Sequence, residues 1–205
     1  APFLLGRDPR DIKVIWNLLY GTMRDRGYYT GFMVDAISAV DCALWDIAGK
    51  FYGQPVYRLL GGKYRDEIPA YISGLPVDGL EKKVQLAKTW KEQGYSAVKL
   101  HIGYGMKEDI EIMEALREAL GEDFGLMIDA HWNYSVADAT RLGREMERLN
   151  VLFLECPLNP EDADGYAQLS AALDIPVALG ESDRTHWQYK ELLMKHSCDI
   201  LQDRK

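Results

Sequence analysis

Three acidic residues at equal spacing limit the folds that this chain can adopt. Asp129, Glu155 and Glu181 follow one another at intervals of 26 residues, and each comes directly after a short apolar run. Such a run is typical of a buried strand in a parallel sheet, where helices cover the strands. A carboxylate at the end of a buried strand contributes little to packing. The repeat therefore predicts strands of one parallel sheet, with helices between them and the acids along one edge.

The same alternation of apolar runs and helical patterns extends from residue 66 to the end of the sequence. Helices are indicated by apolar side chains at helical spacing, as at Ile110, Met113 and Leu116. The predicted strands are 68–73, 97–101, 126–129, 152–155, 177–180 and 199–202. The predicted helices between them are 79–93, 107–120, 136–149, 162–172 and 185–195.

Parallel strands joined by helices form either a doubly wound sheet or a (β/α)₈ barrel. Charged residues end nearly every predicted strand, which favours the barrel because its strand ends all line one central site. A doubly wound sheet would concentrate its site at one switch point. We therefore predict an α/β fold of the (β/α)-barrel type. Six units are visible where a barrel has eight, and the chain starts with Ala1 and stops soon after an apolar run, so we expect it to be cut at both ends.

The first part of the chain has a helical pattern throughout. The predicted helices run from an N-cap at Asp11 to about residue 20, over 32–51 and over 56–60. Gly53 and Pro55 are expected to end the longest of them. This region is interpreted as a helical packing domain without chemistry of its own.

Composition excludes several classes of partner. The 205 residues carry a formal net charge of −8, which argues against a nucleic acid or an anionic membrane as partner. No apolar run approaches the roughly 18 residues of a membrane span, and no signal peptide is recognisable. The three cysteines are far apart and form no CxxC pair, so we expect a reduced, cytoplasmic protein.

The three regularly spaced acids predict a metal site. Asp129, Glu155 and Glu181 would lie side by side around one rim of a barrel, where three carboxylates repel one another unless a cation joins them. Ligation by oxygen alone suits a hard ion, and few protein ligands with open positions suit Mg²⁺ better than Ca²⁺. The alternative is that these acids cap the following helices or pair with surface cations.

Lys99 and His101 are the candidate bases. They are two residues apart on one predicted strand, so both side chains point to the same side and could reach the rim beside Asp129. A lysine in a partly dry site next to a divalent cation has a lowered pKa and can accept a proton. The alternative is a lysine that extends to solvent and a hydrogen-bonded core histidine.

Three further polar residues belong to the predicted site. His131 has the same strand parity as Asp129 and could act as a general acid, although a loop histidine bonded to the backbone would also explain it. Asn133 is assigned to substrate binding, together with Lys99 and His101. Asp203 ends the last predicted strand, where it would orient a base on the next strand.

These residues resemble those of the enolase superfamily, in its mandelate racemase and muconate lactonizing enzyme-like subgroup. Lys99-Leu-His101 resembles the Lys-x-Lys or Lys-x-His of the family's second strand. Asp129, Glu155 in Glu-Cys-Pro and Glu181 in Gly-Glu-Ser match its three metal ligands, and Asp203 matches the aspartate of its Asp-His dyad. Residues 36–46, 53–56 and 59–62 resemble the helix that joins its two domains and the segment after it.

The resemblance implies a fold, a cofactor and a shared reaction step. An α+β capping domain would close a modified TIM barrel, with residues 1–62 as the C-terminal helical part of the cap and the linker, and 63–205 as the first six βα units. One Mg²⁺ per site would bind a substrate carboxylate while a base removes the α-proton and an enediolate forms. The histidine of the dyad falls outside this sequence.

Two departures from the family pattern narrow the expected reaction. His131 stands where many members have asparagine, and His101 replaces the second lysine of a two-base racemase. Both favour β-elimination of water from an aldonic or aldaric acid. A cycloisomerase of a sugar-acid lactone or anhydro acid is the alternative, followed by a racemase or epimerase, and then by a non-catalytic barrel protein or pseudoenzyme. The expected partners are a sugar-acid substrate and further copies of the chain.

Overall fold

The computed structural model describes residues 2–202. By its internal contacts the chain divides into two compact units. Among the described residues, the first holds 2–68 together with Asp183–His186, and the second holds Pro69–Ser182 and 187–202. The predicted domain division after residue 62 stays a prediction, and Asp203 lies outside the described residues.

The first unit is built from three helices. They are α1 (Ile12–Arg24), α2 (Phe32–Tyr52) and α3 (Val56–Leu59). Helix α2 ends as predicted, because Gly53 adopts the left-handed conformation with φ 62° and Gln54 N–H bonds the carbonyl of Gly49 at 2.9 Å. Helices α1 and α2 pack through buried apolar side chains, namely Ile12, Ile15, Leu44 and Ala48.

Helix α1 begins where the sequence predicts and extends further than expected. Asp11 occupies the N-cap position, but its side chain makes no capping hydrogen bond. The helix also continues beyond residue 20, to Arg24. Tyr20 is buried in a second cluster with Val34 and Ile37, and this packing holds the helical conformation where the sequence pattern weakens.

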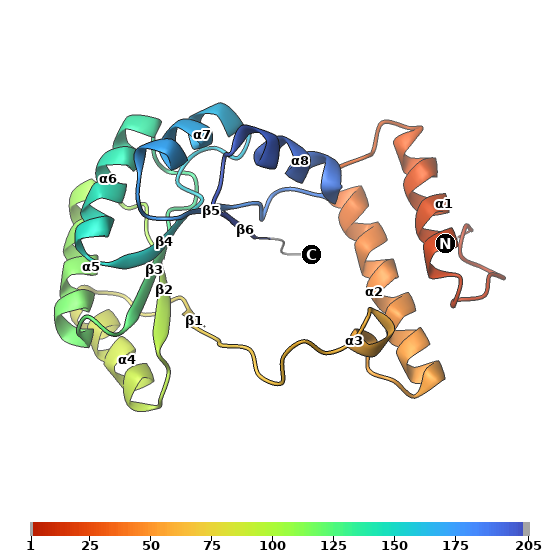
Figure 1. Ribbon diagram of the computed structural model, residues 1–205, viewed down its shortest axis with the longest axis horizontal. Coiled ribbons are helices and arrows are strands. Elements are labelled where there is room, and N and C mark those ends of the chain that lie inside the picture. The colour runs from red at the N-terminus through yellow and green to blue at the C-terminus, as the bar shows by residue number, and fades with distance from the viewer. Residues whose placement is uncertain (1, 203–205) are drawn as a thin grey trace. The chain divides into compact units, whose positions relative to one another are not determined.

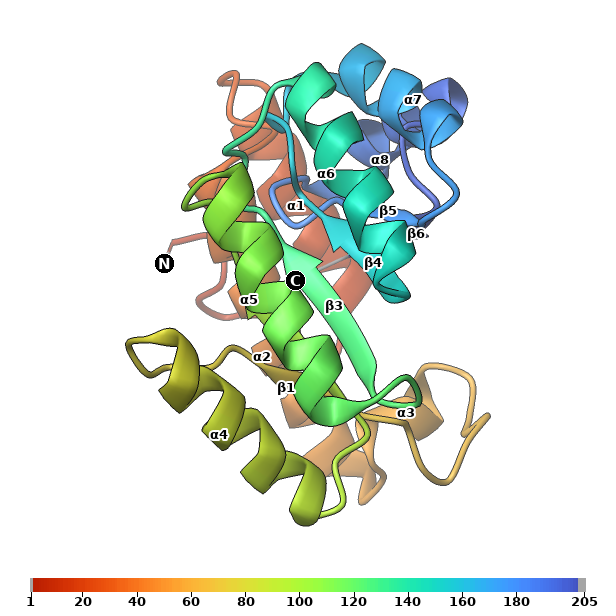
Figure 2. The same ribbon diagram turned by 90° about the vertical axis from the view of Figure 1, so that its left-hand side faces the viewer.

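The second unit is a parallel sheet with helices between consecutive strands. The strands are β1 (Ile72–Ser73), β2 (Ala97–His101), β3 (Gly125–Asp129), β4 (Val151–Glu155), β5 (Val177–Leu179) and β6 (Ile200–Leu201). The helices are α4 (Leu80–Glu92), α5 (Met106–Leu120), α6 (Val136–Arg148), α7 (Ala163–Ala172) and α8 (Thr185–Lys195). Helices α4–α7 lie along the outer side of the curved sheet (Figure 1), and in the turned view α5 lies in front of the sheet and runs along the direction of β3 (Figure 2).

The order of the strands distinguishes a doubly wound sheet from the predicted (β/α)-barrel type. The six strands are hydrogen-bonded in the order β1-β2-β3-β4-β5-β6, and every pairing is parallel. A doubly wound sheet reverses its strand order at a switch point, and no reversal occurs among these six strands. The predicted α/β fold with successive βα units of the barrel type is confirmed.

Alternation along the strands separates the core from the site. In β2, Val98 and Leu100 are buried in the apolar cluster that also contains the helix residues Met113 and Leu116. Lys99, between them, points to the other face of the sheet. The sheet therefore packs its helices against one face and presents polar side chains on the opposite one.

Strands β1 and β5 are shorter than predicted. A strand over 68–73 was expected, but only Ile72 and Ser73 pair with β2. Ile68 is 80% exposed, and Pro69 has no N–H to donate to a ladder. Strand β5 ends at Leu179 because Gly180 adopts φ 123°, a conformation that interrupts pairing.

The described residues contain neither a disulfide nor a candidate membrane span. Cys42, Cys156 and Cys198 are free thiols. Between residues 2 and 202 we find no helix with the length and apolar character that a membrane crossing requires.

Candidate metal and catalytic site

The carboxyl ends of β2, β3 and β4 place three polar residues in one row. His101 pairs with Asp129, and Asp129 pairs with Glu155. Side chains at paired positions of neighbouring strands lie on the same face of a sheet. They line a cleft of about 880 Å³. The remaining lining residues are Tyr71, Ser73, Lys99, Ile102, Gly103, Tyr104, His131, Asn133, Glu181, Leu201 and Gln202.

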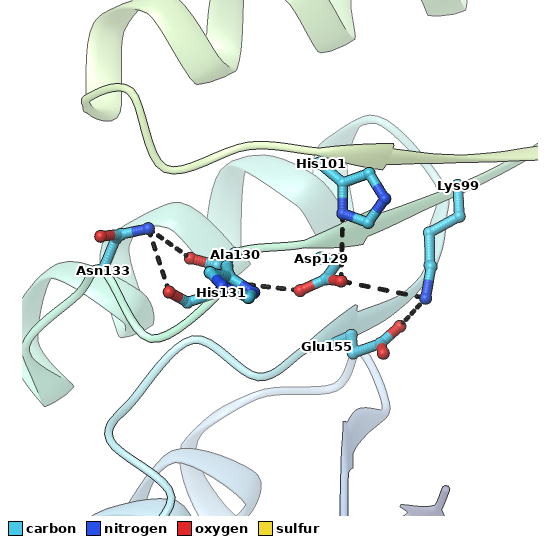
Figure 3. Close-up of polar contacts among 7 residues, drawn as sticks. All are labelled: Lys99, His101, Asp129, Ala130, His131, Asn133 and Glu155. Carbon is cyan, nitrogen blue, oxygen red and sulfur yellow. Dashed lines mark hydrogen bonds and ion pairs between the residues drawn. The ribbon is translucent and has the colours of Figure 1, made fainter. Parts of the chain in front are cut away.

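Lys99 lies between two buried carboxylates (Figure 3). Its ammonium group donates a hydrogen bond to Glu155 Oε2 and lies 4.0 Å from Asp129 Oδ2. His101 Nδ1 approaches the same Asp129 oxygen at 3.2 Å. Lys99, Asp129 and Glu155 are 7%, 4% and 2% exposed. Buried charges are stable only when they are paired, so this lysine serves as the counter-ion of the two acids.

Burial and the ion pair between Lys99 and Glu155 shift the pKa values of both side chains. Burial raises the pKa of Glu155, and the Lys99 ammonium opposes that rise without cancelling it. Burial alone would lower the pKa of Lys99, but the hydrogen bond and charge of Glu155 outweigh it, and the pKa lies above its usual value. The lowering expected for Lys99 beside a divalent cation stays a prediction, and the protein groups by themselves raise the pKa of this lysine. The reason is that two carboxylates face the lysine, and they favour its charged form.

Glu181 lies beyond the end of β5 and lines the same cleft as the other two acids. Burial is the main cause of the raised pKa of the nearby Cys156 thiol. The negative charges of Glu181, Glu155 and Asp129 raise this pKa further, so all three carboxylates lie near the thiol. Within residues 2–202, however, no three His, Cys, Asp or Glu side chains converge closely enough to hold an ion between them. The donor chemistry fits Mg²⁺, since three carboxylates line one cleft. Their joint ligation of one ion stays a prediction.

His131 and Asn133 reach the cleft by a turn. Strand β3 ends at Asp129, and His131 and Trp132 adopt left-handed conformations with φ 46° and 65°, so strand parity does not orient His131 as expected. The His131 N–H donates to Asp129 Oδ1 at 3.1 Å, and its ring stacks on Trp132 with centroids 4.5 Å apart. Asn133 Nδ2 donates to the carbonyls of Ala130 and His131, at 3.1 Å in each case (Figure 3).

Sequence reasoning missed residues that lie around this row. Tyr71 lines the cleft, and its ring centroid is 5.9 Å from Lys99 Nζ. Asp109 is fully buried behind the loop that follows β2. A signal for Asp109 is present in the sequence, because this acid lies on the same helical stripe as Ile112, Met113 and Leu116. An acid in an apolar stripe requires a specific partner.

Two family models match this chain, and together they cover most of its length. A family model described as the mandelate racemase / muconate lactonizing enzyme N-terminal domain matches residues 1–61, and one described as enolase C-terminal domain-like matches residues 82–203. The chain belongs to the enolase superfamily, in its mandelate racemase and muconate lactonizing enzyme group. This confirms the resemblance that the site residues indicated.

Individual relatives act on sugar acids by name. The chain is 38% identical over 204 residues to D-galactarolactone cycloisomerase from Agrobacterium fabrum, covering 98% of the chain and 54% of the relative. It is 39% identical over 208 residues to L-talarate/galactarate dehydratase from Salmonella typhimurium, covering 98% and 51%. A crystal structure of that dehydratase, liganded with Mg and L-lyxarohydroxamate, has a TM-score of 0.90 and 37% identity over 98% of this chain and 51% of that one. This enolase superfamily chain thus spans about half the length of these relatives.

Proposed function

We propose that this chain carries the proton-transfer site of a Mg²⁺-dependent acid-sugar dehydratase. The reaction removes the α-proton of a sugar-acid carboxylate and then eliminates water from the β-position. The observation that carries the proposal is the burial of Lys99, Asp129 and Glu155 together at the carboxyl edge of a parallel sheet. Similarity to a dehydratase and to a cycloisomerase of sugar acids supports the substrate class.

The three acids are the proposed metal ligands. Asp129, Glu155 and Glu181 supply carboxylate oxygens to one cleft, which is the donor type that Mg²⁺ prefers. When bound, the ion would supply positive charge that stabilises the anion left when the α-proton departs. A relative with Mg bound supports this choice of ion. A cation beside the acids would also weaken their hold on the Lys99 proton, because it competes for the same negative charge.

Lys99 is the proposed base and His131 the proposed acid. The neutral amine of Lys99 takes the α-proton, and the electron pair of that C–H bond passes into the carboxylate group to give an enediolate. That pair then enters the bond between the α- and β-carbons as the β-hydroxyl leaves. His131, as imidazolium, gives a proton to the departing β-hydroxyl, which leaves as water. The resulting enol becomes a 2-keto-3-deoxy acid. His101 and Asn133 are assigned to binding the substrate, and Asp203 to orienting a base on the next strand.

Cycloisomerisation is the second candidate. The relative from Agrobacterium fabrum is named for a galactarolactone, and opening of a lactone ring can start with the same α-proton abstraction. The leaving group is then the ring carboxylate oxygen rather than a hydroxyl, so no water is lost. Product mass separates the two reactions, because cycloisomerisation conserves it.

The experiment incubates the full-length protein and Mg²⁺ with a panel of aldonic acids, aldaric acids and their lactones. Semicarbazide detects the keto acid, and proton NMR in D₂O detects exchange of the α-proton. Keto product together with exchange is the expected result. Absence of both across the panel would overturn the proposal. The predicted cytoplasmic location and homo-oligomeric state remain predictions.

A further inference from the structure

Asp109 is a buried carboxylate whose partners all come from loops. It lies in the first turn of α5 and is 0% exposed. It accepts hydrogen bonds from the N–H groups of Gly103 at 2.9 Å and Tyr104 at 3.2 Å, and from the hydroxyl of Tyr134. Gly103 and Tyr104 belong to the loop after β2, and Tyr134 to the loop after β3. One carboxylate therefore joins two neighbouring loops to the start of α5.

Both loops carry residues that line the cleft of the predicted site. Gly103 and Tyr104 line the cleft from the first loop, and His131 and Asn133 line it from the second. Lys99 and Asp129 lie instead on strands β2 and β3, where the sheet ladder holds them. Loss of the carboxylate would thus affect the loop residues before the strand residues.

The loops also touch each other at Gly103. This residue has φ 111°, and a Cβ there would lie 2.5 Å from Asn133 Nδ2 and 3.0 Å from the Ala130 carbonyl oxygen. The space beside Gly103 admits no side chain, so the two loops are closely packed at this residue. Asn133 in turn donates to the His131 carbonyl. A path of direct contacts therefore connects Asp109 to the turn that carries His131.

We propose that Asp109 and Tyr134 are positioning residues that hold His131 and Asn133 for the elimination step. Neither residue lines the cleft, so both act through the loops. The Tyr134 ring packs against the apolar core, which makes Phe a substitution that keeps the packing and removes only the hydroxyl. The inference rests on the proposed function, in which His131 serves the departure of water and Lys99 serves proton abstraction.

The kinetic experiment compares Tyr134→Phe and Asp109→Asn with the unsubstituted full-length protein. Two rates are measured in D₂O with Mg²⁺ and a turned-over sugar acid, namely α-proton exchange and keto-acid formation. A purely structural role lowers the amount of folded enzyme and reduces both rates equally. The positioning role predicts that elimination falls by about tenfold or more while exchange falls less. An unchanged ratio of the two rates in both folded variants would overturn the proposal.

Hydrogen exchange of backbone amides tests the same assignment without turnover. In Asp109→Asn, the amides of Gly103 and Tyr104 should exchange on the order of tenfold faster than in the unsubstituted protein. The matched control is Tyr166→Phe, which removes another buried hydroxyl, one that donates to the Leu158 carbonyl at 2.5 Å. It should leave those two amides unchanged.

The two measurements separate failure of this inference from failure of the proposed function. An unsubstituted protein without α-proton exchange contradicts the proposed function, and the amide measurement still decides whether Asp109 holds the loops. Amides of Gly103 and Tyr104 that stay equally protected in Asp109→Asn would contradict the inference even in an active enzyme.

Discussion

Lys99 and His131, the proposed base and the proposed acid, are held in place by different elements and different contacts. Lys99 is fixed by a strand and by ion pairs with Glu155 and Asp129. His131 lies in a left-handed turn and stacks on Trp132. In the proposed reaction, proton abstraction and departure of the hydroxyl therefore depend on separate side chains from separate elements, so each role can be tested by its own substitution.

Replacing His131 by Asn should stop elimination and leave proton abstraction intact. Asn keeps a polar side chain of similar reach but has no proton to transfer at neutral pH, so keto-acid formation should fall by about 10²–10⁴-fold. NMR in D₂O should still detect exchange of the substrate α-proton. If exchange is lost together with elimination, His131 is not simply the acid for the leaving group.

The sequence predicted the identities of these residues better than their surroundings. Asp129 and Glu155 end their strands as the local pattern predicts, and Lys99 and His101 share β2. Glu181 lies beyond the end of β5, and the roles of these residues stay predictions. The turn at His131 could not be predicted, because left-handed conformations at two consecutive non-glycine residues depend on contacts from the next strand. Trp132 N–H, for example, donates to the Cys156 carbonyl at 2.7 Å.

Helix α5 is anchored to its neighbours by a buried arginine. Arg117 is 6% exposed, and its guanidinium donates to backbone carbonyls that precede β3 and follow α6. The acceptors are Gly121, Glu122, Phe124, Leu149 and Asn150, at 2.7–3.4 Å. Arginine suits this place because its planar group presents five donors in a fixed arrangement.

Arg117→Met should lower the free energy of unfolding by more than about 3 kcal/mol, because several buried carbonyls lose their donor at once. The free energy of unfolding of Arg117→Lys should lie between those of the unsubstituted protein and Arg117→Met, since an ammonium group can satisfy only some of the acceptors. Urea denaturation of the full-length protein measures both. A Lys variant less stable than the Met variant would contradict this account of the contact.

Helix α6 is tied to the segment before β5 by Glu147. Its carboxylate accepts the N–H groups of Asp174 at 2.6 Å and Ile175 at 3.2 Å. Burial opposes ionisation, but the Arg144 guanidinium and these two N–H groups outweigh it and hold the pKa of Glu147 below its usual value of 4.5. A group with a lowered folded pKa stabilises the protein above its unfolded pKa and loses that effect as the pH falls through the folded value.

Glu147→Gln should therefore reduce stability by about 1–2 kcal/mol at pH 7. The difference from the unsubstituted protein should shrink as the pH falls below 4.5, the usual pKa of this carboxyl. Denaturation midpoints between pH 7 and pH 3 give the comparison. A difference that stays constant over this range would show that the carboxylate charge contributes nothing.

Elements were predicted well where periodicity is long and poorly at their ends. Helix α5 was expected over 107–120 and runs from Met106 to Leu120, because its apolar stripe spans four turns. Strand β1 was overestimated, since exposure of Ile68 depends on tertiary packing that no local pattern records. The links from Arg117 to Leu149 and Asn150, and from Glu147 to Asp174 and Ile175, join residues 27 to 33 positions apart in the chain and have no local signature.

At the scale of the molecule, sequential parallel order places every strand end of the second unit at one edge of the sheet. This topology brings Asp129 and Glu155 together although 26 residues separate them. It also explains why the 26-residue spacing of Asp129, Glu155 and Glu181 predicts their common location. Each βα unit returns the chain to the same edge of the sheet. What spacing could not predict is that Lys99 would pair with both acids.

The central claim is that Asp129, Glu155 and Glu181 bind a single Mg²⁺, and calorimetric titration of the full-length protein with Mg²⁺ tests it most directly. The unsubstituted protein should bind one ion per chain, and Asp129→Ala, Glu155→Gln and Glu181→Gln should each abolish binding. Glu161→Gln, which changes an exposed glutamate, should bind as the unsubstituted protein does. Unchanged Mg²⁺ affinity in Glu155→Gln or Glu181→Gln would contradict the account.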